Sequence, residues 1–352
     1  MSDYDAAIHS AALFDRSHAG KLVLTGADAP MFLGNLSTND IKNLPLGSGC
    51  EAYFCDSRAK VQFQTWIYHT HQNTMWVETT PGRNEALAKY LDRYLISERV
   101  EIADRTDEFA QFHLAGPQAK ALLEKALGET LPELEHFQDH RSGSRQTSVL
   151  TLRRNSGEFR YDESENALAE FANLERTFAL RRRDPLGLPG FDLVVPKELA
   201  VETTQRLTAV GAIPGSAETY ETLRIEAGTP LFGPDIDENR FVMEVGNAAR
   251  AVSYTKGCFL GQEPIVMARD RAGHVNRAFL GMKVLDGGPL PPGTKLFREG
   301  QEVGQVTSSC HSPRLGLPVA LGYLRWKHQE PGTRLEAETK QIVEVVGLPP
   351  VK

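Results

Sequence analysis

The segment Lys256-Gly257-Cys258-Phe259-Leu260-Gly261-Gln262-Glu263 places one cysteine between two glycines. A thiol acts as a nucleophile or metal ligand in its thiolate form, and a lysine ammonium two residues earlier favours that form. The glycines allow positive φ and the close approach of a ligand or of another backbone. We therefore predict that Cys258 and Lys256 carry chemistry. The alternative is a tight turn that contains a buried structural cysteine.

The composition is that of an ordinary globular chain. Of the 352 residues, 41% are hydrophobic and 24% are charged, and the length suffices for two or three packed units. No apolar run reaches the roughly 18 residues of a membrane-spanning helix. The acidic start of the chain lacks the features of a signal peptide or presequence, so we expect a cytoplasmic location. The net charge of −7 argues against broad nucleic-acid binding.

The four cysteines are Cys50, Cys55, Cys258 and Cys310. Their spacing forms no CxxC pair and no zinc ligand set. Four scattered cysteines in a long chain fit free thiols better than a disulfide framework. Cys50 and Cys55 are more simply explained as neighbours on a strand than as metal ligands.

Periodicity predicts two parts, residues 1–272 and 273–352. The first part mixes helices and strands and contains a variable insertion near 128–184. Its predicted helices are 4–14, 29–36, 84–95, 118–127, 166–174, 197–210 and 215–227, and its predicted strands are 21–26, 51–54, 61–68, 75–79, 100–103, 109–115, 148–152 and 190–196. The second part contains only short strands between Gly/Pro turns, at 278–284, 295–298, 302–308, 319–323 and 342–346. That pattern is typical of a small all-β barrel.

Several segments resemble one family in the same order along the chain. The octapeptide is similar to the K-G-C-Y/F-x-G-Q-E signature of the YgfZ-type folate-binding proteins, which are relatives of the glycine-cleavage T-protein. The segments 22–29 and 36–41, Leu223–Glu238, and 304–308 with 320–323 resemble further blocks of that family. The resemblance implies an α+β fold of three lobes with a C-terminal all-β barrel and tetrahydrofolate in a central opening.

The resemblance also implies site residues. Glu226 matches the carboxylate that binds the pterin, and a carboxylate can accept two hydrogen bonds from an amino-pyrimidine edge; the alternative is an exposed helix charge. Tyr254 would stack on the pterin or fill the core. Gln262 and Glu263 would contact the ligand or cap a helix. The remaining predicted folate contacts are Asn39 and Arg271, although a solvated surface also explains the arginine.

One departure from the T-protein pattern concerns catalysis. Where that protein carries an aspartate that activates the folate amine, this chain reads Arg58-Ala59-Lys60-Val61-Gln62-Phe63-Gln64-Thr65. Glutamine cannot act as a general base or hold negative charge at neutral pH. Aminomethyl transfer is then disfavoured unless Asp56 or Asp40 substitutes, so whether the chain is an enzyme stays open.

The sequence thus leads to three functional hypotheses. The first is a tetrahydrofolate-binding accessory protein for iron–sulfur cluster assembly or repair, with Cys258 as a reactive thiol. Its partners would be folate and iron–sulfur proteins or their assembly machinery, with no nucleic acid, no membrane and no resident metal. A single thiol supports only a transient or shared cluster. The alternative is a folate-dependent aminomethyl or one-carbon transferase. The third hypothesis is a folate-binding protein without catalytic activity, in which Cys258 would be structural.

Overall fold

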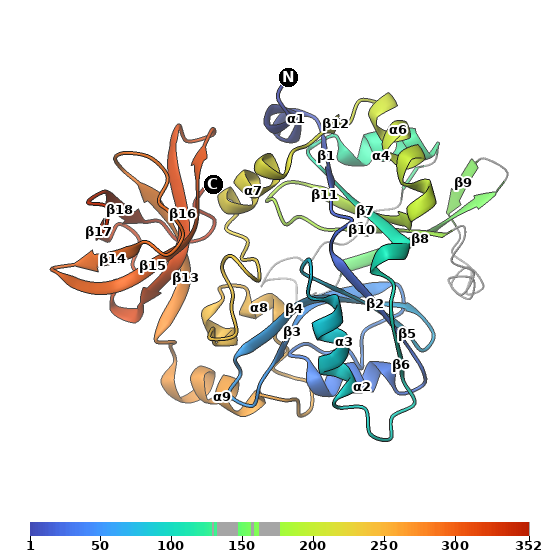
Figure 1. Cartoon of the computed structure of the whole chain (residues 1–352), viewed down its shortest axis with the longest axis horizontal. Coiled ribbons are helices and arrows are strands. Elements are labelled where there is room, and N and C mark those ends of the chain that lie inside the picture. Colours follow the sequence, from blue (N-terminus) through green and yellow to red (C-terminus); the bar gives the residue numbers. More distant parts are fainter. Residues whose placement is uncertain (129, 132–146, 156–157, 162–176, 352) are drawn as a thin grey trace.

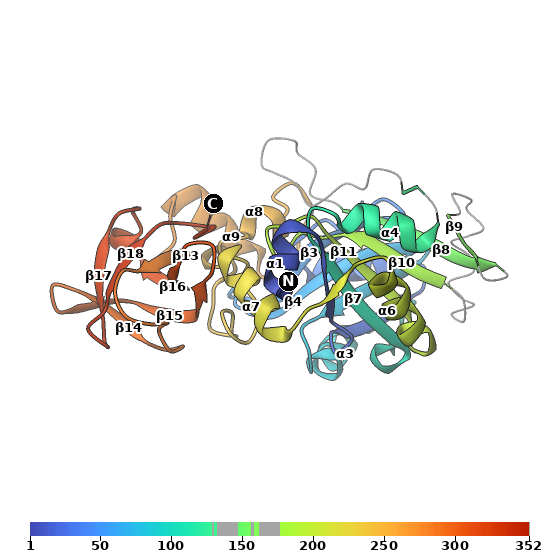
Figure 2. The ribbon, with the colours of Figure 1, turned by 90° about the horizontal axis from the view of Figure 1, so that it is seen from above.

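The structure, a computed structural model, describes residues 1–128, 130–131, 147–155, 158–161 and 177–351. Figure 1 shows a large body of helices and strands with a smaller β-barrel beside it, formed by the C-terminal part of the chain. Seen from above, the barrel lies at one end of an elongated molecule (Figure 2). The α+β class with a C-terminal all-β barrel is confirmed. No helix among these residues is long and apolar enough to cross a membrane.

Twelve strands within the described residues form one sheet with two halves. The halves are joined where β3 and β8 pair, at Ser48↔Ser148 and Gly49↔Thr147. The first half contains β2 (Gly20–Thr25), β3 (Ser48–Cys55), β4 (Val61–His71), β5 (Thr74–Thr79) and β6 (Glu101–Asp104). The second half contains β1 (Ala12–Asp15), β7 (Phe109–Ala115), β8 (Thr147–Asn155), β9 (Glu158–Tyr161), β10 (Thr177–Arg182), β11 (Gly190–Pro196) and β12 (Ile213–Pro214).

The first strand of the chain belongs to the second half of the sheet. β1 lies between β7 and β12, whereas β2, the next strand along the chain, pairs with β5 and β6. The chain therefore crosses from one half to the other between Asp15 and Gly20. The Arg16 amide donates to the Gln111 carbonyl over 2.8 Å, which fixes this crossing against β7. Arg16 therefore lies in the segment that connects the two halves.

Helices cover the two halves of the sheet separately. Side chains of α2 and α3 share one core with the first half, and side chains of α4 and α6 share another with the second half. The described α-helices are α1 (Asp3–His9), α2 (Ala29–Leu36), α3 (Asn84–Asp92), α4 (Ala119–Leu127), α6 (Ala200–Ala209), α7 (Ala217–Glu226), α8 (Ala248–Ala251) and α9 (Gln262–Met267). Figure 1 shows α7 and α9 between the large sheet and the barrel.

The barrel closes in the order β13-β16-β15-β14-β17-β18. Its interior is apolar and includes Met282, Val306, Leu324 and Val345, all fully buried. The strands are β13 (Arg277–Val284), β14 (Lys295–Arg298), β15 (Gln301–Ser312), β16 (Leu317–Arg325), β17 (Arg334–Ala337) and β18 (Ile342–Val345). Five of the six were predicted at these positions, and β17 was not.

The predicted helix 4–14 is wrong over its second half. α1 ends at His9, and the apolar residues that follow form β1, where Ala12 pairs with Ala115 and Leu13 with Leu114. A short apolar run fits a buried strand as well as a helix, and here pairing with β7 decides. The other predicted helices outside the variable insertion occur within a few residues of their expected ends. The predicted strand 148–152 lies within β8, and the predicted helix 166–174 lies outside the described residues.

Candidate functional site

Polar side chains lie inside strands that are buried along their whole length. Every residue of β7 and β11 is buried, yet these strands contain Gln111, His113 and Asp192. On β5, Glu78 is only 1% exposed. A buried polar or charged group costs free energy unless it is hydrogen-bonded. These four side chains therefore need partners, and they find them in one another and in two arginines.

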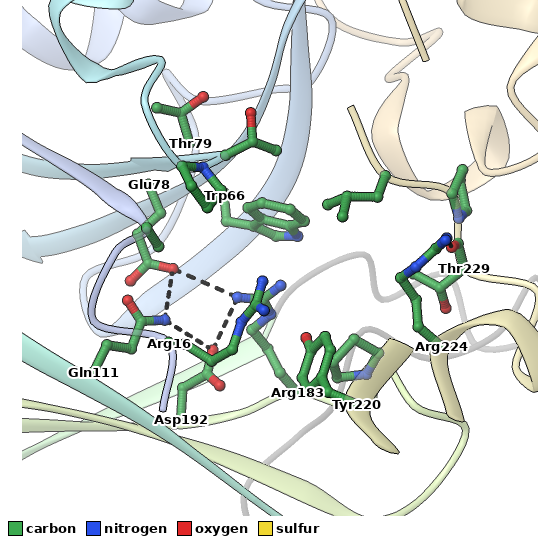
Figure 3. A pocket seen from close by; sticks show the side chains of 16 residues that line it. Arg16, Trp66, Glu78, Thr79, Gln111, Arg183, Asp192, Tyr220, Arg224 and Thr229 are labelled. Carbon is green, nitrogen blue, oxygen red and sulfur yellow. Dashed lines mark hydrogen bonds and ion pairs between the residues drawn. The ribbon is translucent and has the colours of Figure 1, made fainter. Parts of the chain in front are cut away.

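Two carboxylates organise this cluster. Asp192 accepts hydrogen bonds from His113 Nδ1 over 2.7 Å and from Arg183 Nη1 over 2.9 Å. Glu78 accepts from the fully buried Arg181 and from Gln111 Nε2, the latter over 3.3 Å. The same Gln111 amide lies 3.5 Å from Asp192, so it bridges the two acids. Figure 3 shows the interactions among Glu78, Gln111, Arg183 and Asp192 at one side of a pocket.

The charges of the cluster fix its ionisation. Burial works against an ionised Asp192, but Arg183 and His113 outweigh it and hold the pKa of the carboxyl below its usual range. Burial likewise opposes a charged Arg183, while Asp192, Tyr68 and Glu78 raise the pKa of its guanidinium. Asp192 is thus a carboxylate acceptor, and Arg183 is a permanent cation.

The pocket beside this cluster has a volume of about 570 Å³, counting the solvent in its mouth. Its lining comes from both halves of the sheet and from α7: Arg16, Ala19, Trp66, Glu78, Thr79, Thr80, Pro81, Gln111, Arg183, Pro185, Asp192, Tyr220, Arg224, Thr229, Pro230 and Leu231. We call it the central pocket. Arg16, from the segment that crosses between the halves, lines it together with Trp66 of β4 and Glu78 of β5.

Aromatic rings form two walls of the central pocket. The Arg183 guanidinium lies 4.2 Å from the centroid of the Trp66 ring, and that of Arg16 lies 4.1 Å from the Tyr220 centroid. Figure 3 shows Trp66 and Tyr220 on opposite sides of the space, with the two acids at its end. Among the described residues, Arg16 forms no ion pair. A flat ligand that offers N–H donors to carboxylates and acceptors to arginine matches this lining.

The structure gives Lys256 a different role from the predicted one. Its ammonium donates to the carbonyls of Gly34, Ser37 and Asn39 over 2.5, 2.6 and 2.7 Å. These carbonyls lie at and just beyond the end of α2, where a cation is favourable. Burial lowers the pKa of Lys256 to about 8, against the opposing charge of Asp40. The prediction that Lys256 activates Cys258 therefore has no support from the geometry.

Cys258 is exposed, so the alternative of a buried structural cysteine is wrong. Its loop is anchored further along, where the Cys55 thiol donates to the Leu260 carbonyl over 3.1 Å. Gly261 has φ +84°, and a Cβ there would lie 2.6 Å from the Asp56 carbonyl oxygen. Only glycine fits this close approach. The residues described form no group of three potential metal ligands.

The other predicted folate contacts do not line the central pocket. Asn39 is buried and donates to the Glu51 and Arg250 carbonyls. The Tyr254 hydroxyl donates to Met243 Sδ, and the Arg269 guanidinium lies 4.6 Å from its ring centroid. Gln262 and Glu263 begin α9, but no side chain caps this helix, and Arg271 is exposed just beyond it.

Glu226 is buried but also lies outside the lining of the central pocket. Its oxygens accept from the Tyr4 hydroxyl, over 2.7 and 2.9 Å, and from the Ser312 hydroxyl. Tyr4 belongs to α1 and Ser312 to β15, so Glu226 joins the N-terminal helix to the barrel. The exposed-charge alternative is wrong, and the predicted pterin contact has no support here.

Sequence reasoning missed Asp192, Glu78, Arg183, Trp66 and Tyr220 as site residues. One signal was available: Gln111, His113 and Asp192 interrupt strands that otherwise read as core. A charged residue in such a strand must be paired or functional. The sequence did not show that Glu78 and Asp192, 114 positions apart, meet at one pocket.

Comparison with known proteins agrees with this architecture. The profile of the GCVT N-terminal domain matches residues 1–153, and that of the glycine cleavage T-protein C-terminal barrel domain matches residues 277–352. The chain belongs to the glycine-cleavage T-protein superfamily.

Relatives align along almost the whole chain. An aminomethyltransferase from Caldanaerobacter subterraneus subsp. tengcongensis is 25% identical over 96% of this chain and 83% of its own length. An aminomethyltransferase from Symbiobacterium thermophilum is 27% identical over 96% and 84%. The crystal structure of glycine cleavage system aminomethyltransferase T from Bartonella henselae superposes with a TM-score of 0.81 at 22% identity, covering 99% of this chain and 88% of that one. The predicted T-protein-like fold is confirmed.

Proposed function

We propose that the chain binds tetrahydrofolate with the pterin in the central pocket. The observation that carries this proposal is the pair of fixed carboxylates, Asp192 and Glu78, at the end of a space walled by Trp66 and Tyr220. An amino-pyrimidine edge presents neighbouring N–H donors that a carboxylate can accept.

Arg16 supplies the complementary charge. Its guanidinium lies over Tyr220 and pairs with no carboxylate among the described residues, so it is available for a carbonyl or carboxylate of the ligand. Asp192 is in the opposite situation, because His113 and Arg183 already hold it in one orientation. Such preorganised acceptors lose little entropy when a ligand binds.

One-carbon transfer from the bound folate is the second candidate function, and two observations favour it. The relatives named above are aminomethyltransferases. Glu78 also supplies a pocket carboxylate on β5, directly opposite Trp66 of β4. Neither Asp40 nor Asp56 lines the pocket, so Glu78 is the better substitute for the aspartate absent from β4. Gln64 cannot serve, since its amide binds Glu51, the Pro230 carbonyl and the Phe232 amide.

The accessory role in iron–sulfur cluster assembly or repair, with Cys258 as a reactive thiol, stays a finer proposal. Its support is the exposure of Cys258 in a glycine-flanked loop. The geometry adds no activating group from Lys256, whose ammonium is bound by three carbonyls. Alkylation kinetics test it: the thiol of Cys258 should react faster than an unperturbed cysteine if it is chemically activated. Ordinary kinetics would remove the reactive-thiol proposal.

Calorimetric titration with tetrahydrofolate tests the main proposal. Wild-type protein should bind, and Asp192→Asn should weaken binding about tenfold or more, because a charged acceptor is lost. Glu226→Gln is the matched control, a buried carboxylate outside the pocket, and should retain wild-type affinity. Loss of affinity in Glu226→Gln alone would instead restore the role predicted from the sequence. Absence of binding in the wild type would end the folate proposal.

A turnover assay distinguishes a one-carbon transferase from a protein that only binds folate. With an aminomethyl donor and tetrahydrofolate, a transferase should form methylene-tetrahydrofolate and release ammonia and the free carrier, and Glu78→Gln should abolish these products. Binding without turnover would leave the protein as a folate-binding protein that does not transfer the one-carbon group.

A further inference from the structure

A second cavity lies between the barrel and the segment that leads into it. It is a wide cleft of about 1,240 Å³, counting the solvent in its mouth, and it shares no lining residue with the central pocket. Its lining is Lys60, Asn239, Glu244, His274, Asn276, Arg277, Gln301, Arg325, Trp326, Lys327 and His328. We call it the barrel cleft.

The barrel cleft concentrates positive charge on a chain that is negative overall. Four of its lining residues are lysine or arginine and one is an acid, whereas the whole chain carries −7. Within the described part of the chain, Arg277, Arg325 and Lys327 form no ion pair. The acid, Glu244, accepts from the Phe241 amide over 3.4 Å, a hydrogen bond within its own turn. The three cations are therefore available to an external anion.

The strand register sets two of these cations against each other. Arg277 begins β13 and Arg325 ends β16, and they are directly opposite in the antiparallel pair. Like charges at directly opposite positions destabilise a sheet. An acidic residue at either position would stabilise the barrel instead. Such a conflict with local stability is expected where a residue serves a function.

The pKa of the neighbouring His328 is consistent with this excess of positive charge. Burial lowers the pKa of His328, and the charges of Arg298, Arg325 and Lys327 lower it further, with only Glu299 opposing them. The barrel cleft thus has a positive local potential.

An aromatic pair lies among these charges. The rings of His274 and Trp326 stack with centroids 4.6 Å apart at an interplanar angle of 30°. The Trp326 amide donates to the Asn276 carbonyl over 3.0 Å, which fixes the start of β13 against the end of β16. Trp326 still has 51% of its surface exposed. Tryptophan and arginine together are the residues most enriched at the energetic centres of protein interfaces.

We propose that the barrel cleft docks an acidic segment of a partner protein. Carboxylates of that segment lie between Arg277, Arg325 and Lys327, and an apolar side chain covers the exposed part of Trp326. The wide opening suits a polypeptide better than a small ligand, which needs enclosure. A nucleic acid would run beyond the cleft onto a surface whose net charge repels it. This proposal is independent of folate binding.

Fluorescence anisotropy with a labelled peptide tests the proposal. The probe is a nonapeptide with four glutamates on each side of a central phenylalanine, added to the full-length protein at low ionic strength. Wild type should bind it, and added salt should weaken binding. Lys327→Glu should lower the affinity about tenfold or more, because an attraction becomes a repulsion. Lys197→Glu, an exposed charge reversal outside the cleft, is the matched control and should bind as wild type.

Two further variants distinguish specific docking of the peptide in the barrel cleft from nonspecific electrostatic attraction. Trp326→Ala keeps the charge and should still lower affinity several-fold. Arg325→Glu should abolish binding and raise the melting temperature, because it creates an opposite-charge pair with Arg277 across the strands. The proposal is wrong if Lys327→Glu and Trp326→Ala bind the peptide like wild type. It is also wrong if single-stranded DNA of equal charge binds more tightly and loses affinity in these same variants.

Discussion

His113 Nδ1 donates a hydrogen bond to Asp192 Oδ1 over 2.7 Å, and both side chains are at least 97% buried. The two residues are directly opposite on β7 and β11. Gly190 makes room for the ring, since a Cβ at that position would lie 2.7 Å from His113 Cε1. Because the acceptor is a carboxylate, the proton of this bond lies on Nδ1. The orientation of Asp192 is thus set by the sheet itself, before any ligand arrives.

His113→Ala should destabilise the protein by about 1–3 kcal/mol, because a buried carboxylate loses a hydrogen-bond donor. The free energy of unfolding from urea titration measures this loss. His9→Ala, at an exposed histidine near the end of α1, should change it by less than about 0.5 kcal/mol. Equal effects of the two substitutions would show that the bond to Asp192 contributes little.

Acid should remove the stability that Asp192 contributes. The pKa of this carboxyl is lowered in the folded state, from an unfolded value of about 3.9. Its contribution is therefore complete above about pH 4 and is lost as the pH falls through the lower, folded pKa. The melting temperature of wild type should fall steeply below about pH 4, and that of Asp192→Asn should fall less. Parallel curves for the two proteins would contradict this assignment.

Elements marked by their own sequence were predicted correctly, whereas an element that depends on a distant strand was not. Gly190 to Pro196 forms the predicted strand because its apolar β-branched residues favour no other element, and the barrel strands were marked by their turns. Ala12 to Asp15 form a strand because they pair with β7, which lies far away in the sequence. Periodicity does not include that partner, and it predicted a helix. Local patterns were sufficient where they marked both ends of an element, and they failed at β1, where pairing with a distant strand decides the conformation.

The site was harder to predict for the same reason. Lys256 is two residues from Cys258 in sequence, but its ammonium turns to the end of α2, because the last carbonyls of a helix have no partner within the helix. Glu226 resembled a pterin ligand by position, yet tertiary packing gives its oxygens to Tyr4 and Ser312. Asp192 and Glu78 meet only through the order of strands in the sheet, which no local pattern encodes.

Lys256→Met should destabilise the protein by about 1–3 kcal/mol, because three carbonyls near the end of α2 lose a charged donor. The same substitution should leave the alkylation rate of Cys258 unchanged, since no contact joins the two side chains in the described structure. Rates from iodoacetamide labelling, measured with Cys258→Ser as the blank, check this. A clear fall in the labelling rate would restore the thiol-activating role predicted from the sequence.

Among the buried contacts, those that join α7 to the barrel should destabilise the protein most when they are lost. Arg224 is 2% exposed and binds Asp235 over 2.6 Å and Ser308 Oγ over 3.0 Å. Asp235 also accepts from the hydroxyls of Thr307 and Ser308, both on β15. Arg224→Met removes the cation but leaves the buried carboxylate, which costs about 3–5 kcal/mol for such pairs.

Unfolding by guanidinium chloride should therefore show a large loss of stability for Arg224→Met. Arg206→Met is the matched control, because Arg206 forms a half-exposed pair with Glu202 one turn away on α6 and such pairs contribute about 0.3–0.5 kcal/mol. Arg224→Met combined with Asp235→Leu should recover part of the loss, since no uncompensated charge then remains in the core. If the double variant is as unstable as Arg224→Met alone, the cost comes from the lost packing of Arg224 rather than from the stranded charge of Asp235.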